Sequence, residues 1–368
     1  MAVERNRRAP VLDLSRPAGV QVELDVSEAA EVLMSICAIA HPADHDTFDL
    51  GAEWLRARFE TVPDDLRQDV TALRLGDTKV AAHLLGIVWE TPKPRTFAAF
   101  MQRLEATEPM EVKLHLFGHY DTSSRHLPPE VVEAAAAGDR SAIDQVLGHL
   151  AEFSDKHDLY RTFLELDGGE LKARLVDILP RWHREVFAPH EPEWRAAAER
   201  DVEAKRALLA RHSPEQLVEL ATRGYQYAPP PAIRTIAFFP SWFMRPWVIL
   251  WEHKSTKIFC YPIAAAAEEG TPIAEVARVY KALGDEGRLR LLRRLSEGPV
   301  RLSEAAAELG VAKSTAHHHL AILRQAGFVT IRDEDENVYT LRRDLLPQAG
   351  ELLAAYLGSS SRSSATSP

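Results

Sequence analysis

The chain has 368 residues, and a chain of this length is expected to fold into two or more domains. Hydrophobic residues make up 46% and charged residues 27%, a balance typical of globular proteins that excludes a disordered or fibrous chain. No apolar run is long enough to predict a membrane-spanning helix, and no secretory signal follows Met1. Cys37 and Cys260 are the only thiols, too few for a disulfide framework or a thiolate metal site. A cytoplasmic protein is therefore expected.

The net charge of −10 is unevenly distributed along the chain. Residues 271–357 carry 12 Lys and Arg and 12 Asp and Glu, so the acidic excess lies before residue 271. Association with DNA depends on the charge of the face that is presented and not on the sum over the chain. The overall acidity therefore does not exclude a nucleic-acid partner.

The first two thirds of the chain predict one large α+β domain over residues 19–263. Residues 1–18 are polar, rich in Arg and interrupted by Pro, so they are expected to form a flexible arm. Residues 20–26 alternate apolar and polar side chains, which predicts a strand, and Ser27 is the expected N-cap of the helix that follows. From there to about residue 223 the pattern is mostly helical, with Pro residues between the helices.

The pattern changes to strands after Pro229-Pro230-Pro231. Residues 233–239, 247–251 and 257–261 are rich in β-branched and aromatic side chains and are separated by turn-forming residues. They predict a small antiparallel sheet, a three-stranded meander that pairs with the strand at 20–26 and closes the domain. Residues 264–270 are expected to be a linker, and the Ser-rich residues 358–368 a disordered tail.

The order of elements after the linker predicts a winged helix-turn-helix over residues 271–357. Gly310 is expected to make the tight turn between the third and fourth helices, because glycine adopts left-handed dihedral angles without a steric cost. Ser303 is the expected N-cap of the third helix. The expected elements are helices at Ile273–Leu283, Arg288–Leu295, Glu304–Leu309 and Lys313–Gln325, strands at Val329–Arg332 and Val338–Leu341 around a polar wing tip at Asp333–Asn337, and a last helix at Asp344–Leu357.

This region resembles the ArsR-type winged helix family over about a quarter of the chain. The likeness lies in Ala282-Leu283-Gly284-Asp285, Arg288, Arg290-Leu291-Leu292, Leu302-Ser303-Glu304-Ala305-Ala306, Ser314 to Leu323, and Ala326-Gly327-Phe328-Val329. The resemblance implies a DNA-binding transcriptional regulator, a dimeric repressor that leaves its operator when a ligand or metal binds. It assigns no role to the large N-terminal domain.

Helix 313–325 is expected to read duplex DNA. Ala316, His319, Leu320 and Leu323 recur at helical spacing and predict its buried stripe, with His319 as a core histidine whose ring is hydrogen-bonded. The remaining faces are available to the major groove, where the N-terminal residues of such a helix approach the bases. The candidate DNA-binding residues are Lys313, Ser314, Thr315, His317, His318 and Arg324, together with Arg332 and Arg342 of the wing.

The wing departs from the family pattern, which often places Arg at its tip. Here the tip carries four carboxylates at residues 333–336, which phosphate would repel, so it is expected to stay out of the minor groove. The first and last helices of the module are the expected dimer seam, although the same residues can simply cover their own core. The seam residues are Val276, Val279, Tyr280, Leu353, Tyr356 and Leu357.

No metal site or other cofactor is expected. The consecutive histidines 317–319 point about 100° apart on a helix and cannot converge on one ion. The third helix has no Cys and the last helix has no His, so the positions that metal-sensing relatives use are absent. Two groups in the N-terminal domain, His115, His119, Asp121 and His126, and His41, His45, Asp46 and Asp49, carry metal-binding side chains, but ordinary surface residues are the favoured interpretation.

The N-terminal domain is expected to sense a small molecule, without catalysis. Its aromatic cluster, in particular Phe239, Trp242, Trp247 and Trp251, is the candidate effector pocket, with a packed sheet core as the simpler interpretation. Two alternatives remain: control by a protein partner that docks on the N-terminal domain, and an enzyme fused to a DNA-binding module. No phosphate-binding loop, nucleophile elbow or metalloprotease helix supports the enzyme.

Overall fold

The computed structural model describes residues 19–120, 127–153, 161, 164–263, 272–332 and 337–359. The expected arm (1–18), the linker (264–270), the acidic wing tip (333–336) and the tail from residue 360 lie outside these residues, as do Asp121 and His126. No helix among the described residues has the length and apolarity needed to cross a bilayer.

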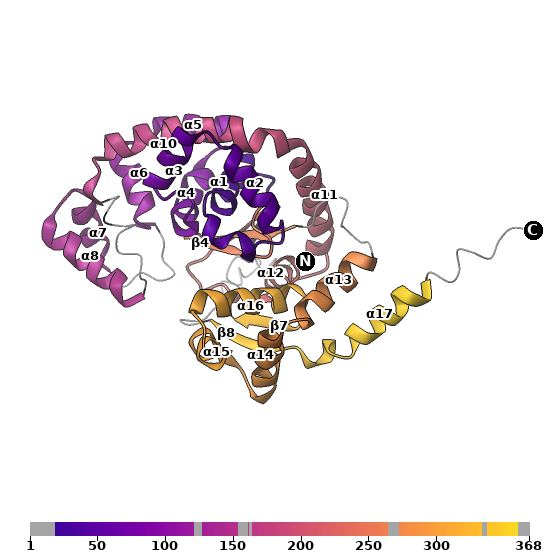
Figure 1. The fold of residues 1–368 in the computed structure, drawn as a ribbon. Helices are drawn as coiled ribbons and strands as arrows, with labels where there is room; N and C mark the ends of the chain where they lie inside the picture. Colours follow the sequence, from indigo (N-terminus) through magenta and orange to yellow (C-terminus); the bar gives the residue numbers. More distant parts are fainter. Residues whose placement is uncertain are drawn as a thin grey trace, which may run out of the picture.

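Helices make up most of the N-terminal region. α1 is buried along its whole length, and the Ser27 hydroxyl accepts the amide of Ala30 at 3.2 Å, which confirms the expected N-cap. Figure 1 shows α10 and α11 as an outer arc around α1 to α4, with α7 and α8 to the left and α12 beside the C-terminal region. The elements are α1 (Glu28–Ile39), η1 (Pro42–Thr47), α2 (Ala52–Thr61), α3 (Asp64–Ala72), α4 (Thr78–Glu90), α5 (Phe97–Ala106), α6 (Pro109–Leu116), α7 (Pro129–Ala136), α8 (Arg140–Phe153), α10 (Gly168–Trp182), η2 (His183–Phe187), η3 (Ala188–His190), α11 (Glu191–Leu209) and α12 (Pro214–Thr222).

The first sheet has the order β1-β3-β5-β4, built from β1 (Gln21–Leu24), β3 (Thr235–Ser241), β4 (Ile249–His253) and β5 (Thr256–Pro262). β1 pairs with β3, so the expected contact of the first strand with the later ones is confirmed. The meander is wrong, because β3 pairs in parallel with β5 and β4 lies at the edge, antiparallel to β5. β3 is buried on both faces from Ile236 to Ser241, which suits an inner strand between parallel neighbours.

The C-terminal region is a winged helix-turn-helix, as the order of its elements predicts. One cap differs: α15 begins at Leu302 and its N-cap is Arg301, whose amide donates to the Glu304 carboxylate at 2.8 Å, so Ser303 lies inside the helix. The elements are α13 (Pro272–Leu283), α14 (Glu286–Glu297), β6 (Val300–Arg301), α15 (Leu302–Leu309), α16 (Lys313–Gln325), β7 (Val329–Arg332), β8 (Val338–Leu341), η4 (Arg343–Leu345) and α17 (Gln348–Ser359).

A short strand from the N-terminal region completes the winged-helix sheet. β2 (Tyr225–Gln226) follows α12 and pairs in parallel with β7, so the second sheet has the order β2-β7-β8-β6. The Ile331 amide donates to the Gly224 carbonyl at 2.8 Å in the same place. The two regions are therefore joined by backbone hydrogen bonds as well as by the chain between them. We call this contact, between residues 222–226 and 246–247 on one side and residues 317–332 on the other, the domain seam.

Candidate nucleic-acid interface and domain seam

α16 is held as the second helix of the helix-turn-helix. Ala316, Leu320 and Leu323 are fully buried, which confirms the expected apolar stripe. Gly310 ends α15 with φ of 69°, in the left-handed region that permits the tight turn. α15 and α14 pack against α16, so its inner face is covered by its own module.

The first turn of α16 is open to solvent. Lys313, Ser314 and Thr315 are exposed, and their side chains supply a cation and two hydroxyl groups. Residues at this end of a recognition helix approach base edges and phosphates in the major groove. The structure therefore leaves three of the eight expected DNA-binding residues together at an accessible helix end.

The outward face of α16 beyond its first turn is covered by the N-terminal region. The indole ring of Trp247 lies 5.0 Å from the His317 ring and 5.7 Å from the His318 ring. Ala321, one turn further along the helix, is 4% exposed. Figure 1 shows α16 on the side of the winged helix that faces the N-terminal helices. His317 and His318 are half-buried in this arrangement and do not face open solvent.

Burial changes the titration of both histidines. Loss of solvent lowers the pKa of His317 to about 4, with smaller effects from Arg324 and His318. Loss of solvent also lowers the pKa of His318 to about 4, and the charges of His319 and Arg288 lower it further by smaller amounts. Both rings are therefore neutral at pH 7.

Arg324 occupies a different position from the one expected. Its side chain is 4% exposed, and its guanidinium donates to the Thr222 carbonyl and, at 3.1 Å, to the Pro246 carbonyl. Gln325 donates to the Pro246 carbonyl as well, at 3.0 Å. The expected phosphate contact of Arg324 is not available in this arrangement, because both carbonyls belong to the N-terminal region. The sequence offered no signal for this pairing.

The remaining expected residues are dispersed. Arg332 is exposed at the end of β7, and Arg342 is half-buried after β8. His319 is half-buried, and its Nδ1 lies 3.6 Å from an Asp285 carboxylate oxygen, too far for the hydrogen bond expected of a core histidine. The wing arginines and the first turn of α16 are thus positioned by different elements.

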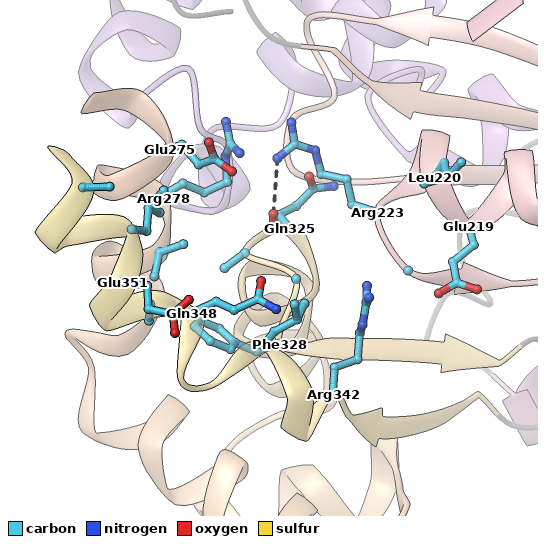
Figure 2. A pocket seen from close by; sticks show the side chains of 18 of the residues that line it. Glu219, Leu220, Arg223, Glu275, Arg278, Gln325, Phe328, Arg342, Gln348 and Glu351 are labelled. Atoms are coloured by element: carbon cyan, nitrogen blue, oxygen red, sulfur yellow. Dashed lines mark hydrogen bonds between the residues drawn. The ribbon is translucent and has the colours of Figure 1, made fainter. Parts of the chain in front are cut away.

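A hollow of about 1010 Å³ lies next to the domain seam, and we call it the seam hollow. Figure 2 shows its side chains converging from α12, α13, the end of α16 and the start of α17. Arg223 lies at the edge of the seam hollow in the left-handed conformation, with φ of 57°. Its guanidinium donates to the Gln325 carbonyl at 3.4 Å. Burial lowers the pKa of Arg223 to about 10, followed by the charge of Arg278. The lining is mixed: Arg223, Arg278 and Arg342 share it with Glu219, Glu275 and Glu351 and with apolar side chains such as Leu220, Phe328 and Leu352.

The four aromatic residues expected to form an effector pocket pack against different neighbours. Trp242 lies 5.2 Å from the Phe243 ring, Trp251 lies 4.4 Å from the His83 ring, and Phe239 is buried beside Trp89. Trp247 faces α16 instead. Among the described residues, these four rings do not surround one cavity, and the packed-core interpretation describes Phe239, Trp242 and Trp251.

The two expected histidine groups also separate. His45 Nε2 donates to the Ile39 carbonyl at 2.9 Å, His41 pairs with Asp44 at 2.8 Å, and Asp49 pairs with Lys281 of α13 at 3.2 Å. These three side chains do not converge on one point. In the other group, His119 lies 3.7 Å from Glu133, whereas His115 is buried in a different cluster of acidic residues.

The expected dimer seam lies on α13 and α17, which pack against each other. The Tyr280 hydroxyl donates to the Ala349 carbonyl at 3.3 Å. Val276 is buried, whereas Leu357 is 60% exposed and Tyr280 is 38% exposed. These residues therefore cover their own module in part and leave apolar surface toward solvent in part.

Comparison with known proteins places the helix-turn-helix in a family. The model of the bacterial regulatory protein arsR family matches residues 285–330, which contain α14, α15 and α16. The uncharacterized HTH-type transcriptional regulator YceK of Bacillus subtilis is 37% identical over 71 residues, which are 18% of this chain and 71% of YceK. The cadmium resistance transcriptional regulatory protein CadC homolog of Staphylococcus aureus is 36% identical over 66 residues, 18% of this chain and 54% of that protein.

The family match contains the exposed first turn of α16 and the buried stripe beneath it. Residues before 285, including the region that covers α16, lie outside the match. With its helix-turn-helix, winged sheet and regulatory relatives, the chain belongs to the ArsR family of bacterial DNA-binding transcriptional regulators.

Proposed function

We propose that this protein is a dimeric, ligand-responsive repressor that reads the major groove with α16. The exposed first turn, with Lys313, Ser314 and Thr315, supports this assignment because its side chains can donate to phosphates and base edges. Arg332 is a further phosphate contact in this proposal. The apolar surface on α13 and α17 supports dimerisation, since two modules then bind two half-sites about one helical turn apart.

The proposed ligand response rests on the contacts by which the N-terminal region covers α16. Trp247 packs on His317 and His318, and Arg324 and Gln325 are hydrogen-bonded to the N-terminal region. A recognition helix enters a groove about 12 Å wide and needs its outward face free. We therefore assign the present arrangement to the form released from DNA, in which the N-terminal region masks the helix.

The seam hollow is the proposed effector site. A molecule bound there would contact α12 of the N-terminal region and α13 and α17 of the winged helix together. Such a molecule binds the masked arrangement more tightly than an open one, and a ligand shifts an equilibrium only by this difference in affinity. Effector binding would therefore release the operator.

The test of base reading uses operator fragments obtained by genome-wide footprinting. Ser314→Ala combined with Thr315→Ala should weaken operator binding by about 1–3 kcal/mol for each base-specific hydrogen bond that is removed, and should leave the fold and the contact with Trp247 intact. Ser296→Ala, which removes a hydroxyl bonded to the Arg293 carbonyl on α14, is the matched control. An unchanged preference for operator over random DNA in the double variant would reject base reading by α16.

The effector site is tested by filling it. Leu220 is 46% exposed on the wall of the seam hollow, and Leu220→Trp narrows the space without removing a seam hydrogen bond. Small molecules that stabilise the full-length protein against heat are retested on this variant. At least a tenfold loss of affinity is expected, and unchanged affinity would place the effector elsewhere.

A further inference from the structure

A cluster of acidic and histidine side chains lies inside the N-terminal region, away from the domain seam. Glu90 is the last residue of α4, and His253 is the last residue of β4. Glu111 and His115 lie one turn apart on α6. One ligand atom each of Glu90, Glu111 and His115 lies within 4.8 Å of the others. α4 packs on both α6 and β4, which brings the three elements together.

Gly86 makes room for the two imidazole rings. A Cβ atom at this position would lie 2.7 Å from His253 Nδ1 and 2.8 Å from His115 Nδ1, closer than side-chain atoms approach one another. The two rings are stacked, 5.3 Å apart and 13° from parallel. Their Nδ1 atoms both face Gly86, which lies one turn before Glu90 on the same helix.

The two histidines differ in what their Nε2 atoms contact. His253 Nε2 is hydrogen-bonded to the Glu90 carboxylate at 2.9 Å. His115 is 2% exposed, and its Nε2 has no hydrogen-bond partner among the described residues. A buried nitrogen without a partner is costly, and such atoms in native structures require an explanation such as an absent water or ion. The same His115 ring offers a ligand atom within 4.8 Å of a carboxylate oxygen of Glu90 and one of Glu111.

We propose that Glu90, Glu111 and His115 bind a divalent transition-metal ion such as Zn²⁺. Two carboxylate oxygens and one imidazole nitrogen are common zinc ligands, and three protein ligands leave a fourth tetrahedral position for water. His253 acts as a positioning residue that donates to Glu90 and orients its carboxylate. Nothing in this inference depends on DNA binding.

Two cations compete with the metal for Glu90. Lys254 Nζ lies 2.6 Å from Oε1, and Arg103 lies 2.7 Å from Oε2. The side chain of Lys254 is 57% exposed and has solvent to move into, so it is the group that the metal displaces. Removal of its ammonium should therefore tighten metal binding, an effect that a structural salt bridge alone would not produce.

The experiment measures Zn²⁺ bound to the full-length, chelator-treated protein by calorimetry, and Co²⁺ bound by its visible absorption. One equivalent is expected. Glu111→Gln should lower the affinity at least tenfold, His115→Gln should abolish the Co²⁺ spectrum, and Lys254→Met should raise the affinity. Glu133→Gln, which changes an exposed carboxylate beside His119, is the matched control and should bind as the parent protein does.

The half-exposed position of Glu111 keeps the test informative if His115→Gln fails to fold. Binding below one equivalent in the parent protein, or equal affinity in the parent and in Glu111→Gln, overturns the site. A rise in the midpoint of thermal unfolding with Zn²⁺ in the parent protein, absent in Glu111→Gln, supports it.

Discussion

The indole ring of Trp247 lies 5.0 Å from the imidazole of His317, tilted by 51°, so a residue just before β4 of the N-terminal region touches the helix that the ArsR family uses for DNA binding. Pro246, the preceding residue, accepts hydrogen bonds from Arg324 and Gln325 of the same helix. The N-terminal region therefore contacts α16 directly, without an intermediate element.

Removal of the Trp247 ring should unmask α16. Trp247→Ala deletes a half-buried aromatic side chain from the seam, which weakens docking by roughly 2 kcal/mol, less than for a fully buried ring. Operator affinity is expected to rise about tenfold or more, measured by fluorescence anisotropy. Trp54→Ala removes another half-buried tryptophan, whose ring lies against His190 and Trp242, and should leave operator affinity unchanged. A fall in affinity with Trp247→Ala would show that the ring supports the DNA-bound form.

Arg324→Met distinguishes two possible roles of Arg324, a contact across the domain seam and a contact with DNA phosphate. The substitution leaves the carbonyls of Thr222 and Pro246 without this donor, at a cost to the masked form of about 1–3 kcal/mol. Operator affinity should therefore rise, and its dependence on salt concentration should keep the same slope. If Arg324 instead neutralises a phosphate, affinity falls and the slope decreases by about one unit. A titration series at several salt concentrations decides between the two outcomes.

Acid should open the domain seam. His317 and His318 have pKa values of about 4 when masked and about 6.5 when free, so the masked form binds fewer protons. Docking is therefore at full strength above about pH 6.5 and weakens as the pH falls toward 4. The charged and titratable groups that act on the two rings are Arg324, His319, Arg288, Asp49 and Lys281.

Hydrogen exchange of the Ile331 amide reports this opening, because its partner is the Gly224 carbonyl across the seam. Exchange, corrected for the intrinsic effect of pH, should be at least tenfold faster at pH 5 than at pH 7. His317→Gln combined with His318→Gln should remove most of that difference. A corrected rate that is equal at both pH values in the parent protein would contradict the prediction.

Glu31 should make the N-terminal region less stable at high pH. Its side chain is fully buried in α1, where it accepts the amides of Trp242 and Phe243 at 2.7 and 3.0 Å. Burial raises the pKa of Glu31 to about 8. Hydrogen bonds from Ser241 and from the two amides, and the charge of Arg245, act in the opposite direction but are smaller. The folded state thus holds a proton that the unfolded state releases above about pH 4.5, and stability falls as the pH rises from about 4.5 to 8.

Glu31→Gln keeps an oxygen for the two amides and removes the titration. Its free energy of unfolding, from denaturant titrations, should exceed that of the parent protein at pH 8 and approach it at pH 5. Glu53→Gln, at an exposed position on α2, is the control and should leave the pH dependence unchanged. A parallel pH dependence in Glu31→Gln and the parent protein would assign the slope to other groups.

The winged helix could be predicted from the sequence because its signals are local. The stripe of Ala316, Leu320 and Leu323 follows from helical periodicity, and the turn at Gly310 follows from the conformational freedom of glycine. The N-cap at Ser27 has the same local origin. Each of these features depends on residues within one or two turns of each other, so no knowledge of the tertiary fold is needed.

The tertiary structure alone decided which surface of α16 is free and how the strands are paired. Trp247 belongs to an aromatic-rich segment that predicts a sheet core. The packing of the two regions decides that Trp247, and not Trp242 or Trp251, contacts His317. Arg324 has the composition of a phosphate contact, yet distant carbonyls bury it. The parallel pairing of β3 with β5, and β2 added to the wing, have the same cause. Contacts between residues far apart in the chain leave no periodic pattern, because each depends on where whole elements pack.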